Sequence, residues 1–86
     1  MTSEQLIALA KGMLNNAGHH ITFAILEEGV RPDGSWWYVP VLATRNGKDV
    51  PREVTVNIYA NIEDALETDH QVNVLFVPVT SESSVG

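Results

Sequence analysis

The N-terminal segment carries apolar side chains at helical spacing. They recur at intervals of three and four residues, which places them on one stripe of a helix. The stripe consists of Leu6, Ala10, Met13, Leu14 and Ala17. Thr2 followed three residues later by Gln5 fits a capping box, and Asn15, Asn16 and Gly18 are stop signals. The pattern predicts an amphipathic helix from about residue 3 to residue 16.

Two later segments alternate in the manner of β-strands. Residues 21–26 and residues 36–42 place successive side chains on opposite sides, and both are rich in β-branched or aromatic residues. Pro32-Asp33-Gly34 is a strong turn signal between them, because proline presets φ and glycine accepts a positive φ. A second turn is expected at residues 46–49. The two segments are therefore predicted to form a hairpin.

Residues 51–68 fit two patterns. Residues 54–60 alternate like a strand, but Val54, Ile58, Ile62 and Leu66 also form a helical stripe that continues past residue 60. Pro51 suits a helix start, where its missing N–H is not needed. We favour a helix from about residue 51 to residue 68 over a strand at 54–60 with a short helix after it. Residues 72–77 then form a strand that ends at Pro78.

These elements predict a single α+β domain at residues 1–79, with the order α-β-β-α-β and a flexible C-terminal tail at 80–86. Pro40 lacks an N–H for a sheet ladder, so the strand at 36–42 is expected at an edge. The strand at 21–26 would then lie between the other two, with 72–77 antiparallel to it. The expectation is a three-stranded, mainly antiparallel sheet of order 2-1-3 with two helices packed on one face.

Both faces of this sheet are apolar enough to be buried. A sheet with one wet face normally alternates apolar with polar residues, yet the strands at 36–42 and 72–77 carry apolar side chains on both sides. We therefore expect an interface for self-association on the uncovered face or on the edge of the last strand, whose residues 72–77 carry no charge. Its candidate residues are Trp36, Trp37, Tyr38, Leu75 and Val77. A bulge at Glu28-Gly29 would decide which tryptophan faces outward.

Two other arrangements would hide the second apolar face. The loops or the tail could fold over it, or the two helices could divide between the two faces.

The negative charge is concentrated in the last third of the chain. Residues 53–86 hold six acidic side chains and no Lys or Arg, whereas residues 1–52 balance to zero. The helix at 51–68 is expected to present Glu63, Asp64 and Glu67 outward as an acidic surface. Such a surface repels nucleic acid and anionic lipid and attracts basic proteins, so we expect a protein partner.

The sequence offers little catalytic or metal chemistry. It has no cysteine, and no serine lies in a nucleophile motif. His19, His20 and His70 with Asp69 form the one set of metal-ligand types, but adjacent histidines on a strand point to opposite sides. We expect no catalytic residues, no metal and no cofactor.

The elements resemble those of a known kind of protein in their order. An aromatic strand at 36–41, an acidic helix segment at 62–67 and an apolar strand at 72–78 resemble small uncharacterised bacterial or phage α+β proteins. The resemblance supports the helix at 51–68 and implies no particular function.

The leading hypothesis is a non-enzymatic protein-interaction or assembly module that forms a homodimer. The alternative is a small acidic inhibitor or nucleic-acid charge mimic that binds a basic site on another protein. An enzyme whose cleft forms only on dimerisation is a third possibility. No run of about 18 apolar residues suggests a membrane span, and the absence of cysteine fits a cytoplasmic protein.

Overall fold

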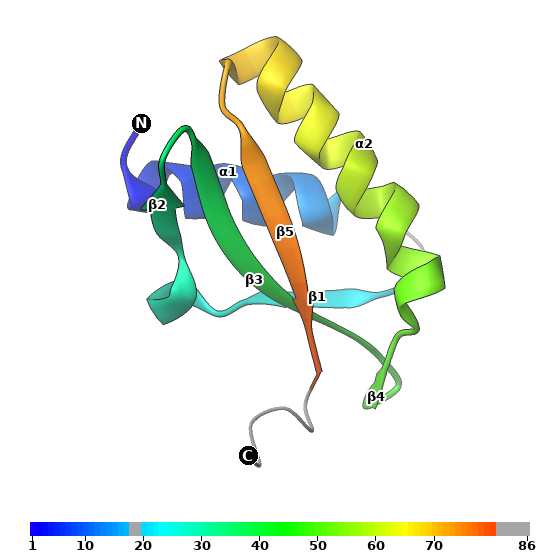
Figure 1. The fold of residues 1–86 in the computed structure, drawn as a ribbon. Helices are drawn as coiled ribbons and strands as arrows, with labels where there is room; N and C mark the ends of the chain where they lie inside the picture. The colour runs from blue at the N-terminus through cyan, green and yellow to red at the C-terminus, as the bar shows by residue number, and fades with distance from the viewer. Residues whose placement is uncertain (18–19, 81–86) are drawn as a thin grey trace.

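The computed structural model describes residues 1–17 and 20–80 (Figure 1). The predicted tail lies outside these residues from position 81 onward, and His19 also lies outside them. The elements in chain order are helix α1 at Ser3–Asn15, strand β1 at Thr22–Ile25, the 3-10 turn η1 at Glu27–Gly29, strand β2 at Arg31–Asp33, strand β3 at Trp36–Arg45, strand β4 at Lys48–Asp49, helix α2 at Arg52–His70 and strand β5 at Val74–Val79. The chain has the predicted α+β architecture.

Both predicted helices are confirmed. Thr2 caps α1 through the expected capping box: its hydroxyl accepts a hydrogen bond from the Gln5 N–H, and the Gln5 side chain accepts one from the Thr2 N–H. The ambiguous segment at 54–60 is helical because α2 buries one continuous stripe that extends to Leu66. Gln71 ends α2 in the left-handed conformation, with φ 57°.

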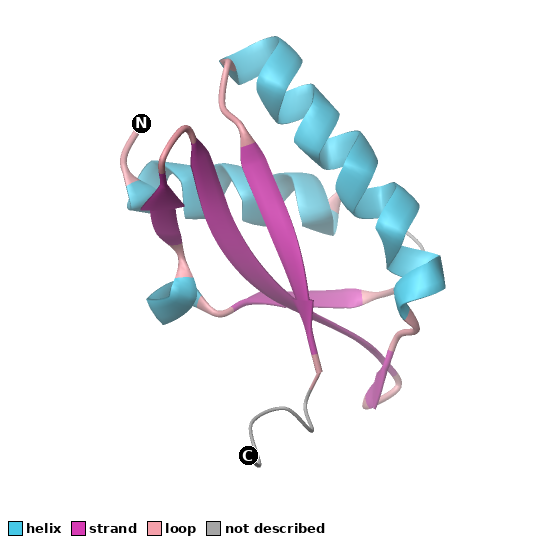
Figure 2. Ribbon diagram, in the orientation of Figure 1, coloured by secondary structure: helices cyan, strands magenta, loops and turns pink. Residues whose placement is uncertain are grey.

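The sheet has five strands, and β3 lies at its centre (Figure 2). Strands β1 and β2 pair with β3 end to end along one side, both antiparallel. Strand β5 pairs with β3 in parallel, and the short β4 pairs antiparallel with the end of β3. The prediction of three strands in the order 2-1-3 was therefore wrong. The strand expected at an edge is central, and β5 pairs with it rather than with β1.

Pro40 is tolerated in a central strand because the neighbouring strand is interrupted there. Leu26 donates its N–H to the Pro40 carbonyl at 3.0 Å, so the Pro40 nitrogen faces the same side. On that side η1 separates β1 from β2, and no ladder bond is required of residue 40. A Cβ at Gly29 would lie 2.7 Å from Cγ of the proline ring. The turn and the proline thus fit closely together, in the segment where the sequence suggested a bulge.

The helices cover one face of the sheet. Residues Leu6 and Leu14 of α1 and Ile58 and Leu66 of α2 join one core cluster with alternate residues of the central strand, such as Val39. In Figure 1, α1 crosses behind β3 and β5, while α2 runs alongside β5. We call the side that packs on the helices the covered face and the opposite side the open face. No helix within residues 1–17 and 20–80 packs on the open face.

Candidate interaction surface

Four of the five residues expected at the interface lie together on the open face. Tyr38 of β3 is paired with Leu75 of β5. Two residues further along both strands, Pro40 is paired with Val77. Trp36 precedes Tyr38 on the same side of β3. Trp36 is 49% exposed and Leu75 is 41% exposed. The open face therefore presents a row of apolar and aromatic side chains to solvent.

Trp37 lies on the other face. Its side chain packs against the core cluster beneath the helices, next to the position of the fully buried Val39. Adjacent strand residues point to opposite sides, so only one of the two tryptophans can reach the open face. The structure assigns Trp36 to the open face and Trp37 to the core.

Arg31 lies at the β2 border of the open face. It is paired with Tyr38 across β2 and β3, and its guanidinium carbon lies 5.5 Å from the centre of the Tyr38 ring. A guanidinium over an aromatic face gains a cation–π interaction. Within the described ranges Arg31 has no ion-pair partner. The aromatic ring therefore holds a positive charge over the open face, whose β2 border also carries Asp33.

Trp36 separates two hollows. On one side lies an aromatic hollow of about 300 Å³, lined by Asp33, Trp36, Tyr38 and Leu75. On the other side lies an acidic hollow of about 210 Å³ between α2 and the start of β5. The acidic hollow is lined by Trp36, Ala60, Glu63, Asp64, Glu67, Asn73 and Val74. The predicted acidic residues and the exposed tryptophan thus border the same space.

The three carboxylates of the acidic hollow have different surroundings. They stand at spacings of one, three and four residues, so they share one side of α2. Asp64 and Glu67 are exposed and have no ion-pair partner among residues 1–17 and 20–80, where the structure shows the pair Lys11–Glu27 at 2.7 Å. Glu63 is half-buried and is held by the backbone of β5. Asp64 and Glu67 are therefore the carboxylates available to a partner.

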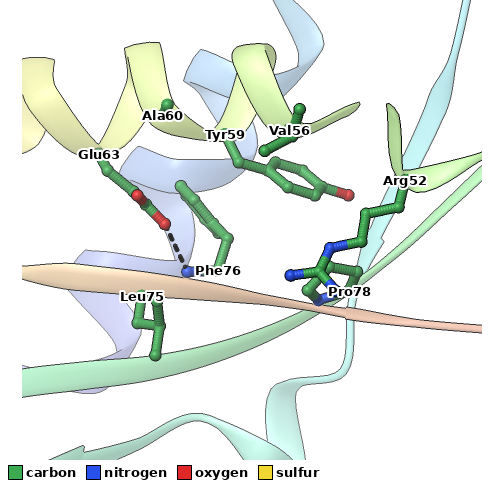
Figure 3. A pocket seen from close by; sticks show the side chains of 8 residues that line it. All are labelled: Arg52, Val56, Tyr59, Ala60, Glu63, Leu75, Phe76 and Pro78. Carbon is green, nitrogen blue, oxygen red and sulfur yellow. Dashed lines mark hydrogen bonds between the residues drawn. The ribbon is translucent and has the colours of Figure 1, made fainter. Parts of the chain in front are cut away.

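Glu63 closes part of the free edge of β5 (Figure 3). Phe76 donates its backbone N–H to Glu63 Oε2 at 2.9 Å, on the side of β5 that faces away from β3. Two residues later Pro78 has no N–H on this side. An edge strand with few free donors is a poor template for pairing with another strand. Although residues 72–77 carry no charge of their own, a carboxylate from α2 protects their edge.

A third hollow of about 180 Å³ lies between α2 and β5 beyond Glu63. Figure 3 shows Arg52 and the ring of Tyr59 directed toward Pro78 there. Burial raises the pKa of the Tyr59 hydroxyl above its ordinary value of 10.0, and a hydrogen bond with the Thr55 side chain opposes part of that rise. The Tyr59 ring packs against Phe76, with ring centroids 5.4 Å apart. Tyr59 is thus a core residue whose hydroxyl reaches the end of the sheet.

The described residues contain no metal centre. In residues 1–17 and 20–80, no three side chains of histidine, cysteine, aspartate or glutamate lie close enough together to hold a metal ion. His20 and His70 are both exposed, and His19 lies outside the described ranges.

Sequence reasoning missed two features of this surface. Arg31 was not expected on this surface, although it lies on the same side of β2 as Asp33, which the register places opposite Trp36. The bond from Phe76 to Glu63 joins residues 13 apart and depends on how α2 docks beside β5. Alternation within β2 could have indicated the first feature. No local pattern indicates the second.

Comparison with known proteins gives no relative for this chain. No helix within the described ranges has the length and apolar character needed to cross a membrane. No family model matches the sequence, and neither a curated protein nor a solved structure matches the chain.

Proposed function

We propose that this chain is a non-enzymatic protein-interaction module that self-associates through the open face. The observation that carries the proposal is an apolar sheet face without a covering helix, with Trp36 about half exposed beside Leu75. Large apolar side chains that gather on one surface of a small domain commonly mark an interface. A second copy of the chain is the occupant we assign to it.

The size of the open face predicts a weak dimer. β3 has 10 residues, so the face is about 33 Å long at roughly 3.3 Å per residue. The face is three strands wide, because β1 and β2 lie end to end on one side of β3 and β5 lies on the other. At about 4.8 Å per strand, its flat area is on the order of 450 Å² per copy. A standard interface takes about 800 Å² from each partner. Two open faces packed together are therefore expected to form a reversible dimer rather than an obligate one.

The face is a better site for assembly than the edge of β5. Edge pairing would require free N–H groups along β5, but Phe76 already donates to Glu63 and Pro78 has no donor. Packing of two sheets through their faces needs no free backbone donors, because it depends on side-chain contact.

Sedimentation equilibrium across a concentration series tests this proposal. We expect a monomer–dimer equilibrium that persists in high salt, since apolar burial is the main attraction. Leu75→Ser should weaken the dimer about tenfold or more. Val54→Ser is the matched control, because Val54 on α2 is 40% exposed and Leu75 is 41% exposed. Equal effects of the two substitutions would contradict an interface on the open face.

The second candidate function is binding of a basic partner by the acidic surface. It is supported by the exposed carboxylates of Asp64 and Glu67 beside Trp36, which form no ion pair within the part of the chain that the structure describes. This function needs no dimer, and its affinity should fall steeply with salt. A chain that remains monomeric but binds a polycationic peptide only at low ionic strength would favour it over self-association.

A further inference from the structure

We infer that, in the dimer, Arg31 of each copy enters the acidic hollow of the other copy, across a two-fold axis that runs along β3. This inference rests on the proposed self-association and specifies its geometry. It assigns a partner-binding role to Arg31 and identifies Asp64 and Glu67 as the groups that receive it.

Arg31 needs an anion once the open face is covered. Its guanidinium lies above the Tyr38 ring, well inside the surface that a second copy would bury. Burial of an unpaired cation is costly, whereas a hydrogen-bonded carboxylate offsets most of that cost. Within the described ranges its own chain provides no ion pair. Asp33 shares this face of β2 but lies level with Trp36 and forms no ion pair with Arg31, so a carboxylate of the partner would supply the counter-charge.

Symmetry limits which carboxylates can meet Arg31. In a two-fold interface, if one residue contacts a second across the interface, the second also contacts the first. An axis along the central strand places the β2 side of one copy over the β5 side of the other. Arg31 is level with Tyr38, and Tyr38 is level with Leu75 in β5. The Arg31 of the partner copy would then lie over Leu75.

The acidic hollow is within reach of that position. It is bordered by Asn73 and Val74, the residues directly before Leu75, and by the side of α2 that carries Asp64 and Glu67. One to two residues along a strand correspond to about 3–7 Å, which an extended arginine side chain can span once its guanidinium leaves the Tyr38 ring and turns toward α2 of the partner. Arginine also suits this role because its planar guanidinium can bind a carboxylate through two parallel hydrogen bonds.

Other orientations of the axis are electrostatically unfavourable. An axis across the strands would place β2 over β2 and β5 over β5, so that Arg31 could not reach the acidic hollow of the other copy, and an axis along β2 would place Arg31 over Arg31. Each chain carries a formal net charge of −6, so further contact between like charges would oppose association. The axis along β3 is the arrangement that pairs opposite charges. It also brings Trp36 and Tyr38, both on β3, close to their counterparts near the axis.

A charge-exchange experiment tests the pairing. Arg31→Glu and Glu67→Arg are each expected to raise the dimer dissociation constant about tenfold or more in sedimentation equilibrium. The double variant should return it to within about threefold of the original value, because the pair is re-formed with its signs exchanged. Glu53→Arg changes the net charge by the same amount as Glu67→Arg at the other end of α2. This control should not weaken the dimer and should not rescue Arg31→Glu.

The outcomes separate this inference from the proposed function. If the native chain dimerises but the double variant shows no rescue, or if Glu67→Arg alone tightens the dimer, the pairing across β3 is wrong while self-association stands. If the native chain is monomeric at the highest concentration, both proposals fail. Urea unfolding of each variant verifies its fold, and Arg31 and Glu67 are both exposed in the monomer.

Discussion

The covered and open faces of the sheet are built from alternate residues of the same strands, yet they differ in burial. Val39 and Val41 on the covered face are fully buried, whereas Trp36 on the open face is half exposed. Nothing in the local sequence separates the two sets, because both are apolar. The difference shows that burial in this domain depends on where the helices dock. Apolar residues without a covering helix, such as Trp36 and Leu75, remain exposed to solvent.

The largest effect is expected where the covered face meets α2. Leu66 is fully buried in the core cluster, so Leu66→Ala should lower the free energy of unfolding by about 2–5 kcal/mol. Leu75→Ala on the open face, measured in the monomer, should lower it by about 1 kcal/mol or less. Urea unfolding followed by circular dichroism provides the comparison. Similar losses in the two variants would mean that the open face is covered as well.

The two adjacent tryptophans provide a closer comparison. Trp37 is half-buried against the core cluster, and Trp37→Ala should cost about 2 kcal/mol of unfolding free energy. Trp36→Ala should leave the stability of the monomer within about 0.5 kcal/mol and weaken the dimer instead. Unfolding at low concentration and sedimentation at high concentration measure the two effects separately. An exchange of the two phenotypes would show that the register of β3 is wrong.

Glu63 lies at the border of the two faces, and its loss should expose the edge of β5. Glu63→Ala removes the acceptor of the Phe76 N–H and should cost about 1–3 kcal/mol, while Glu63→Gln retains an acceptor and should cost less. Hydrogen exchange at the Phe76 amide, measured by NMR, should become faster in the alanine variant. Unchanged exchange in both variants would contradict the role assigned to Glu63.

The smallest effect concerns Tyr59 beneath the covered face. Burial raises the pKa of the Tyr59 hydroxyl above 10.0. As the pH rises through 10, the unfolded chain therefore loses the hydroxyl proton before the folded chain does. Tyr59 therefore contributes a stability that is fully present below pH 10 and declines as the pH rises through its folded pKa. Tyr59→Phe should show a flatter decline of unfolding free energy with pH in this range. Identical slopes for the two proteins would contradict the effect of burial.

Local patterns were sufficient to predict the helices and the long strands but not the order of the strands. The capping box at Thr2 and the stripe ending at Leu66 are set by neighbours in the sequence. The capping box was confirmed, and the stripe was confirmed from Ile58 to Leu66, but Val54 is exposed and Thr55 is buried instead. Pro40 misled the prediction of strand order, because its missing N–H is accommodated by η1, an interruption in a different strand. The position of the candidate surface on the sheet was predicted in the same partial way. Alternation gave the two sets of side chains on β3, but the docking of the helices decided which set is open.

The parallel pairing of β3 with β5 has a consequence for how the chain folds. Each paired position joins residues 37 apart, from Trp37 with Val74 to Leu42 with Val79. The antiparallel partners of β3 are nearer in sequence and can form earlier, because shorter loops close at a lower entropic cost. Until α2 carries β5 into position, one long edge of β3 stays unpaired next to its apolar residues. Folding is therefore most exposed to aggregation just before the last strand docks.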